Sequence, residues 1–306
     1  FVPSLFSHFL RVRATDNASR VEIPDGGVTI YTSAIPAFDI LGQGAAGGFS
    51  GQCNGGPSNA GFNNPYAVVY DSSNDRLFVS DTANNRVLAF TNTYGGNGLF
   101  VDREGDRVIG QANFQSCDAP NPPTRSSLNG PRGLSYDSTN ARLFVADTGN
   151  NRVLAFPVAN GFASTPEAQY VLGQTTFDAS AAGLGSNGLN TPWGVAHAWN
   201  LSILFVADSA NNRVVGFSTT SLSDGMNATT VLGQTDLVSN GLGTSLRQMS
   251  GPSGLLWVRD FPNVDRLYVS DRGNSRVLVF RMDSAPSNGM DASAYLGVTG
   301  SPGATQ

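Results

Sequence analysis

The stretch RLFVADTGNNRVLAF, from Arg142 to Phe156, decides the fold of this chain. It contains two short apolar runs on either side of the polar cluster Thr148–Asn151. Short apolar runs separated by turn-forming residues predict antiparallel β-strands. The pattern recurs from Arg76, Ile203 and Arg266, with its Asp at positions 81, 147, 208 and 271. The stretch is therefore one copy of an internal repeat.

Two further markers recur with each copy. A Val-Leu-Gly-Gln-like segment follows at 108–111, 171–174, 231–234 and 295–298, and a proline precedes at 65, 131, 192 and 252, with a small residue two places on. Four apolar runs then make up each unit, and in the second clear unit they are Gly133–Asp137, Arg142–Asp147, Arg152–Phe156 and Gln169–Gln174. A repeated unit of four short strands predicts the blade of a β-propeller. The expected fold is all-β, with four-stranded antiparallel blades.

A degenerate copy lies near the N-terminus. Arg20–Asp25 matches Arg76–Asp81, and the FDILGQ segment at 38–43 supplies the closing marker. We therefore count five blades in one domain spanning 1–306, at about 4–43, 62–111, 129–174, 191–234 and 250–298. A sixth blade would require a strand set that is shared or lies outside the chain.

The Asp-Thr-x-Asn-Asn-Arg-Val run, with Pro-x-Gly upstream, resembles the NHL repeat, and the Val-Leu-Gly-Gln marker is similar to that of secreted microbial NHL proteins. The resemblance covers 62–298 well and 1–43 poorly. It implies a propeller. It implies little about activity, since such propellers include lyases, RNA-binding domains and interaction scaffolds, and fold does not fix function.

The recurring polar residues are expected to be structural. A catalytic residue is needed once, whereas a turn is needed in every blade. Asp and Asn favour such turns, and the Arg that follows can pair with the Asp. The set is Asp81, Arg86, Asp147, Arg152, Asp208, Arg213, Asp271 and Arg276. The equivalent aromatic residues Phe78, Phe144, Phe205 and Tyr268 are expected to fill the space between blades.

The composition argues against several function classes. Acidic residues (23) outnumber basic ones (18), and most Arg belong to the repeat, which excludes a nucleic-acid partner. The two His residues, His8 and His197, cannot supply the several metal-binding His of the amidating lyases, and no Gly-x-Ser-x-Gly elbow occurs. We predict no catalytic activity and no cofactor. A structural Ca²⁺ ion and a metal-dependent lyase or lactonase-like enzyme remain as alternatives.

Several features favour an extracellular or cell-surface location. Asn-x-Ser/Thr sequons make Asn17, Asn200 and Asn227 candidate N-glycosylation sites. Cys53 and Cys117 lie in the connectors after successive blades and are disulfide candidates; two free thiols or an intermolecular bond are the alternatives. No apolar run of about 18 residues, the length of a membrane-spanning helix, occurs.

The N-terminal residues 1–16 form an apolar arm that contains Phe1, Leu5, Phe6 and Phe9. This arm either packs on its own propeller or docks on the next molecule, in which case head-to-tail contacts would build a filament. The leading hypothesis is a secreted structural or interaction propeller, with protein partners and self-association. The alternative is a carbohydrate- or peptide-binding module that uses the connectors between blades.

Overall fold

The computed structural model describes residues 61–91, 104–260, 264–282 and 285–297. The chain divides into two compact units, Phe1–Ile40 and Leu41–Gln306, and all described residues belong to the second. The arm at 1–16, the degenerate blade at 4–43, His8, Asn17 and Cys53 lie outside the described residues. The predictions made for them, and for a single domain, stay predictions.

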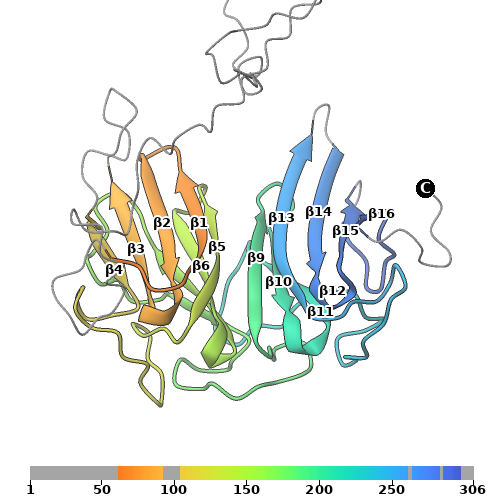
Figure 1. Cartoon of the computed structure of the whole chain (residues 1–306), viewed down its shortest axis with the longest axis horizontal. Helices are drawn as coiled ribbons and strands as arrows, with labels where there is room; N and C mark the ends of the chain where they lie inside the picture. The colour runs from red at the N-terminus through yellow and green to blue at the C-terminus, as the bar shows by residue number, and fades with distance from the viewer. Residues whose placement is uncertain (1–60, 92–103, 261–263, 283–284, 298–306) are drawn as a thin grey trace, which may run out of the picture. The chain divides into compact units, whose positions relative to one another are not determined.

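The described strands form four antiparallel sheets of four strands, each built from consecutive strands (Figure 1). The described part contains short 3-10 turns and no α-helix. This confirms the predicted all-β fold with four-stranded blades. We number the sheets as blades I to IV in chain order.

The strand bounds follow the repeat closely. Blade I contains β1 (Pro65–Asp71), β2 (Arg76–Asp81), β3 (Arg86–Thr91) and β4 (Arg107–Ile109). Blade II contains β5 (Pro131–Asp137), β6 (Arg142–Asp147), β7 (Arg152–Pro157) and β8 (Tyr170–Leu172). Blade III contains β9 (Pro192–Ala198), β10 (Ile203–Asp208), β11 (Arg213–Ser218) and β12 (Thr230–Leu232). Blade IV contains β13 (Pro252–Asp260), β14 (Val264–Asp271), β15 (Arg276–Arg281) and β16 (Ala294–Leu296).

The number of strands in a blade fixes where the connectors lie. Four antiparallel strands return the chain to the end at which it entered, so each connector begins and ends at the same end of its blade. The start of each first strand and the 3-10 turn between the second and third strands also lie there. We call this the connector end.

Apolar clusters fill the space between successive blades. Phe78 of blade I lies in one cluster with Leu134 and Leu154 of blade II. Phe144 of blade II lies in the next cluster with Val195 of blade III. The buried Phe side chains therefore pack where the sequence predicts, and burying one contributes about 1.5–3 kcal/mol to stability.

The first strands of neighbouring blades lie very close together: β1 contacts β5, β5 contacts β9, and β9 contacts β13. A Cβ atom placed on Gly194 would lie 2.2 Å from the carbonyl oxygen of Ser253, and one on Gly133 would lie 2.5 Å from that of Trp193. Only a residue without a side chain allows this approach. The glycine of the Pro-x-Gly motif is therefore explained by the close contact between the first strands of neighbouring blades.

On blades I and IV, one face is not covered by a neighbouring described blade, and apolar side chains on that face are much more exposed than their equivalents between blades. Val68 is 66% exposed, whereas its equivalents Leu134 and Val195 are 8% and 5% exposed. Leu256 of blade IV is 58% exposed, whereas its equivalent Ala196 is 5% exposed. The four described blades therefore do not bury all the surface that the repeat makes apolar, and the predicted count of five or six blades stays a prediction.

Candidate functional site

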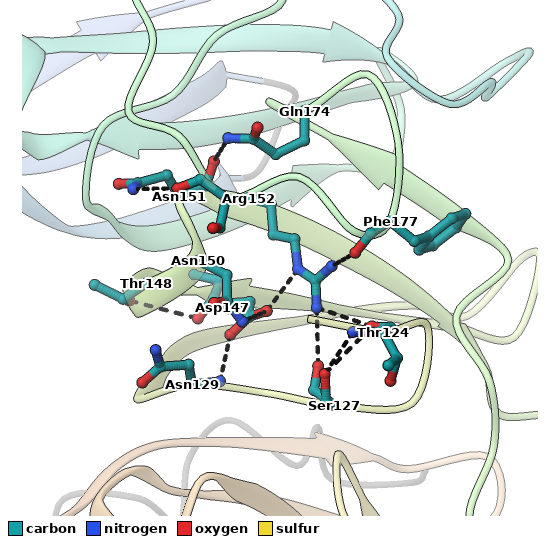
Figure 2. Close-up of polar contacts among 12 residues, drawn as sticks. Thr124, Ser127, Asn129, Asp147, Thr148, Asn150, Asn151, Arg152, Gln174 and Phe177 are labelled. Carbon is teal, nitrogen blue, oxygen red and sulfur yellow. Dashed lines mark hydrogen bonds and ion pairs between the residues drawn. The ribbon is translucent and has the colours of Figure 1, made fainter. Parts of the chain in front are cut away.

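The repeated Asp and Arg form a buried ion pair in each described blade. In blade II, Arg152 Nε donates to Asp147 Oδ2 at 2.7 Å, and neither side chain is exposed. The Asn129 backbone N–H and Asn150 Nδ2 also donate to this carboxylate, at 2.6 and 2.9 Å (Figure 2). Burial raises the pKa of Asp147, and Arg152 and the two amides oppose that rise.

The guanidinium of Arg152 also joins two connectors (Figure 2). Its Nη2 donates to the Thr124 and Ser127 carbonyls of the preceding connector at 3.0 and 2.9 Å, and Nη1 donates to the Phe177 carbonyl of the following one. Arg213 of blade III does the same with Gly188 and Leu237. Both arginine side chains are fully buried and are bonded to the protein's own carbonyls and carboxylates, so the repeated set acts as a structural clamp.

The closing marker completes the clamp. Gln174 Nε2 donates to the Asn151 carbonyl at 2.9 Å and to the Ala181 carbonyl at 2.8 Å, which folds the connector back on its own blade. Gly173 before it has φ +85°, a conformation that favours glycine. The Val-Leu-Gly-Gln marker is therefore explained by packing.

One position within the repeat does not recur. The residue between the proline and the small residue is Tyr66, Arg132, Trp193 and Ser253 in blades I to IV. In every blade the pairing of the first strand shifts across this position, which is a β-bulge. Bulges redirect side chains and are frequent beside functional sites. Each of the four described blades therefore places a different type of side chain at this position, at the connector end.

The side chains at this position in blades I to III lie close together, and Arg272 of blade IV joins them. The Tyr66 and Trp193 rings lie edge to face with centroids 6.1 Å apart. The Arg132 guanidinium carbon lies 4.0 Å from the Trp193 centroid and 5.3 Å from that of Tyr66. Arg272 lies 5.0 Å from the same Trp193 ring. We call Tyr66, Arg132, Trp193 and Arg272 the axial cluster.

Arg272 also departs from the repeat. Thr82 and Thr148 at the equivalent position donate their hydroxyls, each at 2.7 Å, to the carbonyl of the first proline in the next blade, and Ser209 does the same. Blade IV has Arg272 in place of this hydroxyl, and its side chain extends to Trp193 of blade III. Blade IV therefore has no hydroxyl at this position to bond to a neighbouring blade, and Arg272 instead adds a positive charge to the axial cluster.

The axial cluster carries positive charge from two arginines, Arg132 and Arg272. Among the described residues, no carboxylate forms an ion pair with Arg132 or Arg272. Trp193 Nε1 is buried and has no hydrogen-bond partner within the described part of the chain. Tyr66 is 43% exposed, so the cluster is open to solvent. These are the features of a ligand-binding site rather than of a closed core.

His197 lies at the ring-filling position that the alignment of strands predicts. Its ring packs on Phe144 at 5.7 Å, and Nε2 lies 3.1 Å from Thr219 Oγ1. Nδ1 lies 3.9 Å from Asp137 Oδ1, too far for a hydrogen bond. Burial lowers the pKa of His197, although Asp137 opposes the effect. This environment suits a neutral histidine that fills space.

The remaining predicted residues lie apart from the cluster. Cys117 is partly buried and bonds to no other cysteine within the described residues, and its pairing with Cys53, which lies outside them, stays a prediction. The Asn200 amide donates to Asp265 at 2.6 Å and accepts from Trp257 at 3.1 Å, whereas Asn227 is exposed. The two described glycosylation candidates therefore differ in environment: the Asn200 side chain is engaged in hydrogen bonds, and that of Asn227 is exposed.

The described part of the chain contains neither a cluster of metal ligands nor a membrane-spanning helix. No three or more His, Cys, Asp or Glu side chains in this part of the chain gather in a way that could hold a metal ion. No helix in the same ranges has the length and apolar character to cross a membrane. A cavity of about 440 Å³ is lined by the first described connector, including Gln111, Asp118 and Ser127, but no charged cluster converges on it.

Comparison with known protein families finds one NHL repeat in this chain. The NHL repeat model matches residues 128–156, and no curated protein matches the sequence. Similar solved structures include a periplasmic gluconolactonase from Pseudomonas aeruginosa (13% identity, 80% of this chain and 56% of that chain, TM-score 0.45). A second is a functionally unknown protein from Desulfotomaculum acetoxidans (11% identity, 77% of this chain and 59% of that chain, TM-score 0.46). A third is an auxiliary nutrient binding protein from Bacteroides thetaiotaomicron (10% identity, 73% of this chain and 46% of that chain, TM-score 0.44).

The chain spans less than two thirds of the length of each of these structures. The match to the NHL repeat covers one copy of the repeat, residues 128–156. Asp147, Asn150 and Arg152 lie in the matched segment, and the same Asp–Arg pair recurs at the equivalent turn of blades I, III and IV. The second described blade therefore contains an NHL repeat, and the other three described blades share its four-stranded fold.

Proposed function

We propose that this chain is a non-catalytic interaction propeller that binds its partner at the axial cluster. The observation that carries the proposal is the convergence of Tyr66, Arg132, Trp193 and Arg272 from four blades, at positions where the repeat itself imposes no residue type. Residues that the fold requires recur in each blade. These four do not recur, and they meet at one place.

The chemistry of the cluster supports binding rather than catalysis. Aromatic and Arg side chains dominate the energetics of binding interfaces because they bury a large surface and offer directed hydrogen bonds. Trp193 and Tyr66 supply the rings, and Arg132 and Arg272 supply the donors. Neither a nucleophile with an adjacent base nor a carboxylate pair contributes to the described cluster. An extracellular location remains part of the proposal, and its partners are proteins or glycans.

A binding screen with matched variants tests the proposal. The full chain is applied to glycan and peptide arrays together with Trp193→Leu and Trp199→Leu. Trp199 is the matched control because it is 56% exposed and follows the far end of β9. We expect Trp193→Leu to lose the partner and Trp199→Leu to keep it. Loss with Trp199→Leu alone, or binding unaffected by either variant, would refute the assignment.

A second candidate function is self-assembly, and the exposed outer faces of blades I and IV favour it. Val68 and Leu256 present apolar surface at positions that are buried between the inner blades. Light scattering and negative-stain electron microscopy of the full chain test this function. Ordered filaments that disappear on deletion of residues 1–16 would support assembly through the arm, and a clean monomer would exclude it.

The enzyme alternative requires a bound metal ion. A lyase or lactonase-like propeller retains such an ion through purification. Elemental analysis of the full chain, purified without chelator, therefore distinguishes it from the proposed function: a stoichiometric metal would replace the non-catalytic proposal.

A further inference from the structure

The axial cluster offers almost only hydrogen-bond donors. The guanidinium groups of Arg132 and Arg272 have N–H groups and no acceptor, and the indole Nε1–H of Trp193 is likewise a donor only. The hydroxyl of Tyr66 can act in either sense. A ligand that satisfies this set must be rich in acceptors.

The stacking geometry leaves the donors available. Arg132 lies 4.0 Å and Arg272 lies 5.0 Å from the centroid of the same Trp193 ring. A guanidinium held against an aromatic ring keeps the N–H groups at its edge free, and that planar fork matches a carboxylate or phosphate. The ring thus holds the cations in place without consuming their hydrogen bonds.

The two cations also repel each other. Both lie against one ring, and no carboxylate among the described residues pairs with either of them. An anion that contacts both would remove this repulsion. The free protein therefore holds electrostatic energy that a suitable ligand releases.

The charge balance limits the size of that anion. Two arginines neutralise one or two negative charges, and the chain as a whole carries a formal net charge of −5. A long polyanion would be repelled by the rest of the surface. A single oxyanion group meets only the local positive charge.

Accepting the proposed function of the cluster, we infer that its ligand presents an oxyanion, a carboxylate or phosphate group of one or two negative charges. This group binds between Arg132 and Arg272 at the edge of the Trp193 ring. Carboxylate and phosphate groups accept the same hydrogen bonds from a guanidinium, and titration with malonate or with phosphate distinguishes between them.

Nuclear magnetic resonance of the indole N–H signals tests the inference on the full chain. The three Trp residues give three such signals, and Trp193→Phe assigns one of them. Sodium malonate and sodium phosphate are titrated at constant ionic strength, with sodium chloride as the reference salt. We expect the Trp193 signal to shift and saturate with malonate or phosphate, while the signals of Trp199 and Trp257 stay in place.

Arginine variants provide the second arm. Arg272→Gln alters an exposed side chain, so the fold is retained, and its binding should weaken at least about tenfold, as loss of one charge-assisted hydrogen bond implies. Arg132→Gln should act in the same way. The control Arg247→Gln, at an exposed ion pair with Asp291, should bind like the wild type.

The outcomes separate the inference from the function on which it rests. If chloride moves all three indole signals as much as malonate and phosphate do, or if Arg272→Gln binds as tightly as the wild type, the inference is wrong. If, in addition, an uncharged partner from the arrays still requires Trp193, the proposed function stands without the oxyanion. Saturation by malonate alone indicates a carboxylate ligand, and saturation by phosphate alone a phosphate.

Discussion

Removing Arg152 should cost the propeller a large part of its stability. Methionine keeps the unbranched stem of the side chain and deletes the guanidinium. The change removes the 2.7 Å bond to Asp147 and the bonds to three connector carbonyls, at Thr124, Ser127 and Phe177. Breaking one partner of a buried ion pair costs about 3–5 kcal/mol, against a total stability of about 5–15 kcal/mol for a typical domain. We expect a loss near the upper end of that range, because the carbonyls also lose their donor.

Urea denaturation followed by circular dichroism measures the loss. Arg247→Met is the control, since Arg247 also pairs with an aspartate, Asp291, but both side chains are about half exposed, and we expect little measurable change. A result in which Arg152→Met unfolds at the same urea concentration as Arg247→Met would refute the idea that the repeated pair clamps the blades.

The pH dependence of the variant gives a second check. Burial raises the pKa of Asp147, and without Arg152 nothing of opposite charge opposes that rise. The folded variant then holds a proton at this site more tightly than the unfolded chain does. Its deficit relative to wild type should therefore shrink as the pH falls through the folded-state pKa. Adding Asp147→Asn to the variant should recover part of the deficit at neutral pH for the same reason.

Three other predictions follow from single contacts. Gly194→Ala should destabilise the chain by about 2–3 kcal/mol or more because its Cβ would lie 2.2 Å from the neighbouring blade, whereas Gly241→Ala, which has open space, should be neutral in the same denaturation assay. Burial lowers the pKa of His197, so the unfolded chain binds this proton more readily and stability should fall as the pH drops below the ordinary histidine pKa of 6.5. His197→Tyr should weaken the pH dependence of the melting temperature between about pH 5 and pH 7, and an unchanged slope would contradict this. In a secretory host, mass spectrometry should find a glycan on Asn227 and none on Asn200, whose amide is engaged between blades; the reverse would show that the described contact is not kept.

The repeat in the sequence is enough to predict the blades. Strand bounds in blade II match the expected runs, with Arg142–Asp147 identical and Gly133–Asp137 extended by two residues to Pro131. The reason is local: alternation and turn chemistry act over a few residues. The pairing of Asp147 with Arg152 is local as well, since the left-handed residue Asn151 turns the chain between them.

The axial cluster could not be predicted in this way. A search for repeats picks out the prolines and small residues of the Pro-x-Gly motif because they are constant, and it passes over the variable residue between them. The signal that could have found the cluster was this variation itself: Tyr66, Arg132 and Trp193 at equivalent places. Even so, nothing local indicates that Arg272, at a different position of the repeat, extends to the same ring.

The sequence by itself determined the all-β fold, the four-stranded blade and the residues that close each turn, because these depend on neighbours along the chain. Tertiary structure decided which faces meet, and therefore that His197 packs on Phe144 and that side chains from four blades gather around Trp193. Those contacts join residues that are between 53 positions (Phe144 and His197) and 127 positions (Tyr66 and Trp193) apart, and they exist only because the close approach at Gly133 and Gly194 brings the first strands of the blades together.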